Sequence, residues 1–164
     1  MIKKLILAIL VALPTMAMAQ KFGMVDTQSL IQALPEVKEV QTQLEASVKK
    51  YSDEENNLHA EREKKIKEFQ EMDQNTPDAI KQRRVEEIQG LEQKIAEFRQ
   101  TAQQDLQRQQ EQLMAPIQQK IMTAIQSVGT EGGYTMIFEN GISLFTGKDV
   151  VDVTPQVKTK LGVK

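Results

Sequence analysis

Apolar residues recur every three or four positions along a long polar stretch of the chain, residues 36–73. This stretch contains no proline or glycine and is rich in glutamate, lysine, glutamine, leucine and alanine, which favour helix. Its apolar positions are Val37, Val40, Leu44, Val48, Tyr51, Leu58, Ile66, Phe69 and Met72. The pattern predicts one long helix of about 55 Å, at about 1.5 Å per residue, with Pro35 near its first turn.

The same periodicity predicts a second long helix over about residues 78–128. Before it, Thr76 can act as the N-cap, Pro77 fits the first helical position and Asp78 suits the positive end of the helix dipole. The apolar positions of this helix are Ile80, Ile88, Leu91, Ile95, Phe98, Ala102, Leu106, Leu113, Ile117, Ile121, Ile125 and Val128. Pro116 lies inside it and predicts a kink, because proline removes one backbone hydrogen bond.

The connection between the two helices is short, which predicts an antiparallel hairpin with its tip near residues 74–77. Folding back allows each apolar stripe to pack on the other, and it places Tyr51 level with Phe98. Polar residues also fall near the predicted seam, at Glu55, Arg62 and Gln109. We therefore expect a coiled-coil arm, residues 36–128, whose apolar contact is thin in places.

Short β-prone segments bracket this arm. Residues 22–25 predict a strand, and Asp26-Thr27 then offers a cap for a short helix over 28–34. After a helix stop at Gly129, residues 134–138 alternate in polarity and predict a second strand. Asn140-Gly141 is typical of a type I′ turn and predicts a β-hairpin to a third strand over 142–145.

A fourth short strand is predicted over 150–153, and Thr154-Pro155 predicts the N-cap and first position of a last helix through about Leu161. The fold class is therefore α+β, with a long helical hairpin inserted between strands of a small β body, residues 20–35 and 129–164. Four short strands and two short helices bury little core, and strand edges invite pairing. We expect the body to oligomerise with closed symmetry.

The first residues have the order of a secretory signal peptide, residues 1–19. Lys3-Lys4 precede an apolar run over 5–13, and Ala17-Met18-Ala19 follows, which predicts cleavage after Ala19. The alternative is a retained anchor, but the run is about half of the roughly 20 residues that cross a bilayer. The chain has no cysteine, and Gln20 stands where a lipoprotein needs one. We expect an exported protein without disulfides.

Charge and composition offer little support for catalysis or for nucleic-acid binding. The net charge is −2 with both signs interspersed, which disfavours a polyanion binder. The single histidine, His59, is expected to be a solvated surface residue, and no cofactor or metal motif is present. Gly147-Lys148 lacks the other residues of a phosphate-binding loop.

Basic residues flank the predicted tip, where they either solubilise the helices or attract anionic partners such as acidic unfolded chains or lipid head groups. They are Lys64, Lys65, Lys67, Lys81, Arg83 and Arg84. We name these six residues the tip basic cluster. Acidic residues interspersed with them nearly cancel their charge, so we expect any membrane contact to be weak, peripheral and salt-sensitive.

The order of the parts resembles the OmpH-like (Skp) periplasmic chaperones. The resemblance rests on residues 23–26 (Gly-Met-Val-Asp), the charged hairpin, residues 133–138 (Gly-Tyr-Thr-Met-Ile-Phe) and residues 152–154 (Asp-Val-Thr). It implies a homotrimer in which a β body joins three arms around a cavity. Such a protein holds unfolded outer-membrane proteins in the periplasm without ATP, and it is neither an enzyme nor a cofactor carrier.

The body residues that are candidates for oligomerisation are Val25, Tyr134, Met136, Phe138, Ile142 and Leu144. The chain departs from strongly basic members of the family, because its pI is about 5.6. The sequence also permits a structural or adaptor coiled-coil protein of the cell envelope, since the same amphipathic stripes can serve as a spacer or a docking surface.

Overall fold

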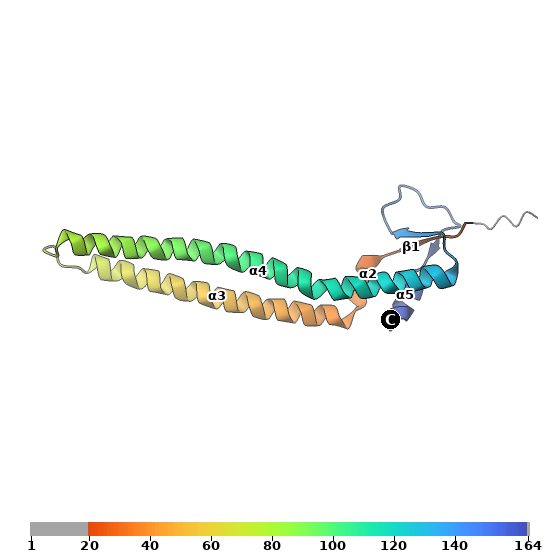
Figure 1. The fold of residues 1–164 in the computed structure, drawn as a ribbon, viewed down its shortest axis with the longest axis horizontal. Helices are drawn as coiled ribbons and strands as arrows, with labels where there is room; N and C mark the ends of the chain where they lie inside the picture. The colour runs from red at the N-terminus through yellow and green to blue at the C-terminus, as the bar shows by residue number, and fades with distance from the viewer. Residues whose placement is uncertain (1–19, 164) are drawn as a thin grey trace, which may run out of the picture.

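The computed structural model describes residues 20–163, so the predicted signal peptide and its cleavage site lie outside the described residues. Two long helices extend from a small body at one end (Figure 1). In chain order the elements are β1 (Phe22–Val25), α2 (Thr27–Ala33), α3 (Pro35–Gln70), α4 (Asp78–Gly132), β2 (Met136–Glu139), β3 (Val151–Asp152) and α5 (Thr154–Leu161).

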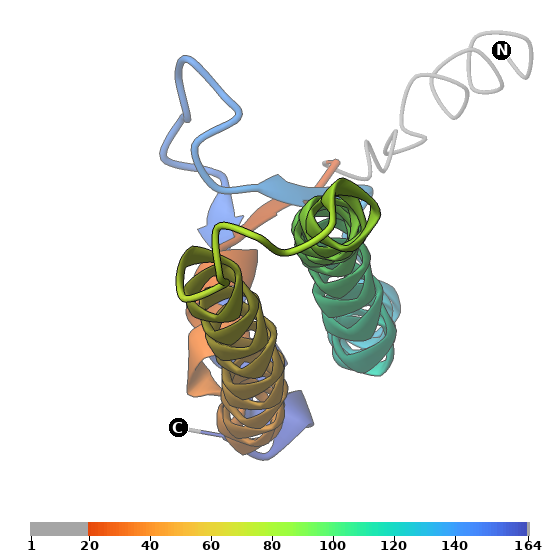
Figure 2. The same cartoon turned by 90° about the vertical axis from the view of Figure 1, so that its left-hand side faces the viewer.

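Helices α3 and α4 lie side by side along the length of α3, as both views show (Figures 1 and 2). Glu36 at the start of α3 contacts Lys120, whereas Lys65 near its end contacts Glu87. Residue numbers thus rise along one helix as they fall along the other, and residues 71–77 make the connection. The last part of α4, which was predicted to belong to the arm, packs on the core of the body through Ala124 and Val128. From here on, the arm therefore means residues 35–120, and the body means the remaining described residues.

The two ends of α4 differ from the sequence prediction. The N-cap of α4 is Pro77, without a side-chain cap bond, so the predicted Thr76 cap is wrong. Instead, the Thr76 amide donates to the Asp73 carbonyl within the connection. The helix also continues through Gly129 and ends at Gly132, because Gly133 adopts a left-handed conformation with φ 65°. A glycine alone does not end a helix unless the backbone turns left-handed there.

Pro116 lies within α4. Figure 1 shows the axis of α4 changing direction in its teal part, the segment that includes this proline by the colour bar. A proline has no N–H to donate to the carbonyl four residues earlier, and its ring crowds that carbonyl. The bend falls where the arm joins the body.

The body contains a three-stranded parallel sheet in the order β2-β1-β3. Phe22 to Val25 pair with Met136 to Glu139 on one side, and Gly23 and Met24 pair with Val151 and Asp152 on the other. The first strand of the chain therefore lies between two strands that follow the arm by sequence.

The predicted β-hairpin at Asn140-Gly141 is wrong. Residues 142–145 form no strand, and β2 pairs in parallel with β1 instead. A type I′ turn needs positive φ at both central residues. Gly141 has φ 87°, but Asn140 is not in the left-handed region, and its amide donates to the Val25 carbonyl at 2.7 Å. This bond extends the pairing of β2 with β1 by one residue. The chain after Asn140 then leads to β3 on the other side of β1.

The core of the body joins α2, the sheet, α5 and the end of α4. Its fully buried side chains are Leu30, Leu34, Val153 and Val157. As predicted, Asp26 caps α2, and its carboxylate accepts from the Ser29 amide at 2.8 Å. Thr154 is the first residue of α5 and not its cap, because its hydroxyl accepts from the Asp26 amide at 3.0 Å. The two chain segments around the arm are thereby fastened together.

No helix among residues 20–163 combines the length and apolar character that a membrane crossing requires.

Candidate functional site

Polar side chains bridge the two helices of the arm at several levels between a few buried apolar residues. The buried apolar residues of the arm are Val40, Leu58, Ile95, Ala102 and Ile117. The polar bridges along the arm include Glu36–Lys120, Ser47–Gln109, Tyr51–Asp105, Glu55–Arg99, Arg62–Glu92 and Lys65–Glu87. The three polar residues predicted near the seam, Glu55, Arg62 and Gln109, all take part.

The first of two polar clusters in the arm is centred on Asp105. Its carboxylate accepts from the Tyr51 hydroxyl, the Gln109 amide and the Arg108 guanidinium. These bonds, led by that of Tyr51, lower the pKa of Asp105. The same bond to Asp105, with some burial, raises the pKa of Tyr51. Gln109 also accepts from the Ser47 hydroxyl at 2.8 Å, so the network crosses the seam twice.

The second polar cluster is formed by Glu55, His59 and Arg99. Arg99 Nε donates to Glu55 Oε1 at 2.5 Å, and Arg99 Nη2 lies 3.0 Å from His59 Nε2. The bond from Arg99 is the main reason that the pKa of Glu55 is lowered. His59 was predicted to be a solvated surface residue, but its side chain is only 34% exposed. It lies against the other helix because Arg99 reaches across the seam to it.

Sequence reasoning missed Asp105 and Arg99 as partners of the seam residues. Asp105 bonds to Tyr51, and Arg99 bonds to Glu55. In each pair, the residue on α4 is nearly as many residues from the tip as its partner on α3. Pairing residues equally distant from the predicted tip could have found both. The periodic pattern alone could not, because it considers only apolar positions.

Most members of the tip basic cluster are held by carboxylates or carbonyls. Glu87 contacts Lys65, Arg83 and Arg84. Its pKa is lowered chiefly by the Arg84 bond. Lys67 pairs with Glu71, and Lys81 donates to the Gln74 carbonyl at 2.8 Å. The structure brings Lys65, Arg83 and Arg84 together around one carboxylate, whereas Lys64 is exposed on α3.

The six candidate oligomerisation residues have different environments. Val25 is buried in the core of its own body, and Tyr134 and Phe138 are half-buried. Met136, Ile142 and Leu144 are exposed, at 58%, 74% and 106%. Phe145, 84% exposed, lies beside them in sequence on the loop between β2 and β3. We call Ile142, Leu144 and Phe145 the apolar loop.

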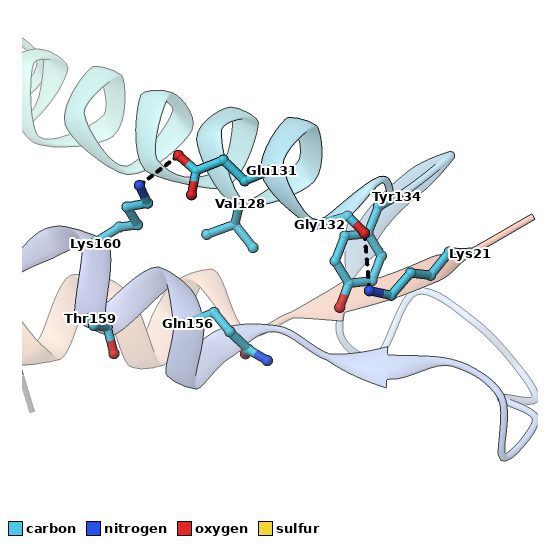
Figure 3. A pocket seen from close by; sticks show the side chains of 8 residues that line it. All are labelled: Lys21, Val128, Glu131, Gly132, Tyr134, Gln156, Thr159 and Lys160. Carbon is cyan, nitrogen blue, oxygen red and sulfur yellow. Dashed lines mark hydrogen bonds and ion pairs between the residues drawn. The ribbon is translucent and has the colours of Figure 1, made fainter.

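A cleft of about 600 Å³ lies between the end of α4 and α5 (Figure 3). Lys21 donates to the Gly132 carbonyl at 3.0 Å and stands 4.1 Å from the centre of the Tyr134 ring. Lys160 pairs with Glu131 at 2.6 Å on the other side. Contacts within the body thus occupy both ends of the cleft.

Within residues 20–163, no three His, Cys, Asp or Glu side chains are grouped as a metal site requires. Exposed large apolar side chains lie on the arm, at Val48, Ile80 and Val85, and on the apolar loop of the body.

A family model described as "Outer membrane protein (OmpH-like)" matches residues 21–161. The match contains every helix and strand of the described chain. The chain belongs to the OmpH-like outer membrane protein family. The resemblance to the OmpH-like family that the sequence predicted is confirmed.

A solved structure has the same OmpH-like fold. It is the crystal structure of a candidate outer membrane chaperone (OmpH-like) from Caulobacter crescentus CB15. The TM-score is 0.73 at 12% sequence identity, and the match covers 87% of this chain and 83% of that chain. No curated protein sequence matches the chain.

Proposed function

We propose that the protein is an ATP-independent holding chaperone of the periplasm, which binds unfolded outer-membrane proteins and prevents their aggregation. The family match over residues 21–161 carries this proposal, because it includes the arm as well as the body. Export through a signal peptide over residues 1–19, cleaved after Ala19, belongs to the same proposal.

The surface of the arm supports this function. Val48, Ile80 and Val85 are 51%, 47% and 37% exposed and lie among charged residues. Separate small apolar contacts within a polar surface suit an unfolded chain, which presents apolar side chains at many points and needs no single pocket. The affinity then comes from many weak contacts that act together.

We further propose that three copies assemble through the body, so that their arms surround one space. The sheet has only three strands, and its outer strands β2 and β3 each have one unpaired edge within the described chain. The apolar loop lies between these two strands, and its burial against another copy would remove it from water. Val25 supports this assembly only indirectly, by holding the core of each body.

The tip basic cluster is proposed to make at most a weak peripheral contact with anionic lipids. Five of its six cations already have a carboxylate or carbonyl partner in the chain. An anionic lipid must compete with these partners, and salt should remove the contact readily.

The central experiment is light scattering while a urea-unfolded outer-membrane barrel protein is diluted into buffer with the mature chain and without nucleotide. The mass of the oligomer is first measured by size-exclusion chromatography with mass detection. We expect a trimer that keeps the client soluble. A trimer without effect on aggregation would favour the structural or adaptor role, and a stable monomer would contradict the proposed assembly.

A variant series tests whether the arm contacts the client. Replacing Val48, Ile80 and Val85 by serine should weaken the suppression of aggregation. Met122→Ser is the matched control, because Met122 is equally exposed, at 53%, but lies outside the arm. Equal activity of both variants would contradict client binding by these arm residues.

A further inference from the structure

The Glu55–His59–Arg99 cluster depends on one protonation state of the imidazole. Arg99 carries only hydrogen-bond donors, so its 3.0 Å contact with His59 Nε2 requires an unprotonated Nε2 that accepts. Arg99 Nε also donates to Glu55. In this state one guanidinium on α4 holds two side chains of α3.

Protonation of His59 changes the partners within the cluster. When Nε2 of His59 is protonated, it becomes a donor and can no longer accept from Arg99. The imidazolium of His59 and the guanidinium of Arg99 are then two cations beside one carboxylate, that of Glu55. His59 stands four residues from Glu55 on the same helix, with Nε2 3.6 Å from Oε1. The imidazolium can therefore keep Glu55 through a contact within α3. A bond between the helices is exchanged for a pair within one helix.

The other charged groups around His59 do not restore the lost bond. Arg62, three residues further along α3, pairs with Glu92 of α4 at 3.9 Å and adds another cation. Glu63 is exposed on α3 and, like Glu55, belongs to the same helix as His59. On α4, Ile95 is the buried apolar residue one turn before Arg99. Among residues 20–163, Glu55 is the only carboxylate of α3 that pairs with Arg99.

The Glu55–His59–Arg99 cluster lies beside the most buried part of the arm, so the loss of a bond between the helices there affects how the two helices are held together. His59 follows Leu58 in sequence, and both Leu58 and Ile95 are only 4% exposed. These are the most buried apolar side chains of the arm, and the Arg99 bonds cross the seam beside them. Without its contact to His59, Arg99 keeps only one of the two bonds that it makes across the seam at this level.

We propose that His59 makes the middle of the arm sensitive to acid, by releasing Arg99 from α3 when the imidazole is protonated. Imidazoles titrate near pH 6.5, within a range where carboxylates stay charged. The chain has one histidine, so a change in the arm between pH 8 and pH 5 can be assigned to it. This inference goes beyond the proposed function, because it concerns the arm without any client.

The test uses the absence of cysteine in the chain. Spin labels are attached to cysteines at Asn56 and Gln100, which are exposed on opposite helices near the cluster. Labelled chains are diluted with unlabelled chains, and the distance between the labels is measured by pulsed electron resonance at pH 8 and pH 5. We expect a wider distribution at pH 5, with the open population increased on the order of fivefold.

Two variants make the result decisive. His59→Gln keeps an accepting oxygen that does not titrate, and it should show the narrow distribution at both pH values. His59→Lys carries a permanent cation and should show the wide distribution at both. A pH response that persists in His59→Gln, or its absence in the parent chain, would overturn the proposal. Aggregation assays are not involved, so this outcome is independent of the chaperone test.

Discussion

The ring of Tyr51 on α3 meets that of Phe98 on α4 edge to face, with centroids 6.0 Å apart and planes at 63°. The two rings are 47 positions apart in sequence, and the connection of the arm lies midway between them. Aromatic pairs prefer this arrangement, since the positive edge of one ring faces the negative face of the other. The contact fixes which residues of the two helices are level.

This contact predicts a crosslink within the chain. Cysteines at Tyr51 and Phe98 should be joined by a short bismaleimide into a species with the mobility of a single chain in denaturing electrophoresis. A mismatched pair, Tyr51→Cys with Ile80→Cys, should not react within the chain, because Ile80 lies near the tip. Dimers in place of the internal crosslink would show that the helices pair between chains.

The bond from Tyr51 to Asp105 predicts a shifted tyrosine titration. The chain has two tyrosines and no tryptophan, so the absorbance of Tyr51 can be read alone in a Tyr134→Phe background. Its phenolate should form above the usual pKa of 10.0, because the charge of Asp105 disfavours a second negative charge. Asp105→Asn should move the titration down towards the usual value. An unchanged curve would contradict the bond.

The same pair sets the sign of the pH dependence of stability. The pKa of Asp105 is lowered by folding, so its contribution is present above the pKa of the unfolded chain and is lost as the pH falls through the folded value. The pKa of Tyr51 is raised, so its contribution is lost as the pH rises through the folded value. Asp105→Asn should weaken both dependences in thermal unfolding, and Gln103→Asn, at an exposed position nearby, serves as the control.

Replacing two glycines of α4 by alanine should change the free energy of unfolding in opposite directions. A Cβ at Gly90 meets no atom within 4 Å, so Gly90→Ala should raise the free energy of unfolding by about 1 kcal/mol through helix propensity. A Cβ at Gly132 would lie 2.4 Å from Cε2 of Tyr134, so Gly132→Ala should destabilise the body. Denaturant unfolding at fixed protein concentration measures both. Stabilisation by Gly132→Ala would contradict the packing of Tyr134.

The apolar loop provides the test of assembly. Replacing Ile142, Leu144 and Phe145 by serine should lower the mass measured in solution, because these exposed side chains need a partner to leave water. Val48→Ser, the same kind of change on the arm, should leave the mass unaltered. If the triple variant keeps the parent mass, these three residues do not hold the oligomer together.

The long helices could be predicted closely because their signals are local. Runs of helix-favouring residues without proline or glycine predicted the end of α3 to within three residues, and Asp26 was one of the two residues predicted to cap α2. The errors arose where one local signal was taken as sufficient. Gly129 does not end α4, because its backbone is not left-handed. Asn140-Gly141 does not form a type I′ turn, because Asn140 lacks the positive φ that such a turn requires.

The polar clusters of the seam were predicted only in part. Glu55, Arg62 and Gln109 were placed near the seam by their spacing, but their partners Arg99, Glu92 and Ser47 stand on the other helix in each case. The environment of His59 depends on Arg99, whose long side chain reaches across from α4. Spacing along one helix contains no information about which cation of the other helix reaches a given position.

Local sequence signals were enough to predict the two long helices, the short connection between them and the β-prone character of both ends, because these depend on neighbours within a few residues. The position of β1 between β2 and β3 in a parallel sheet became known only from the folded chain. Strand pairing joins segments on either side of the arm, and its register depends on which side chains become buried together. The hydrogen bonding of His59 likewise depends on Arg99, which is 40 positions away in the sequence.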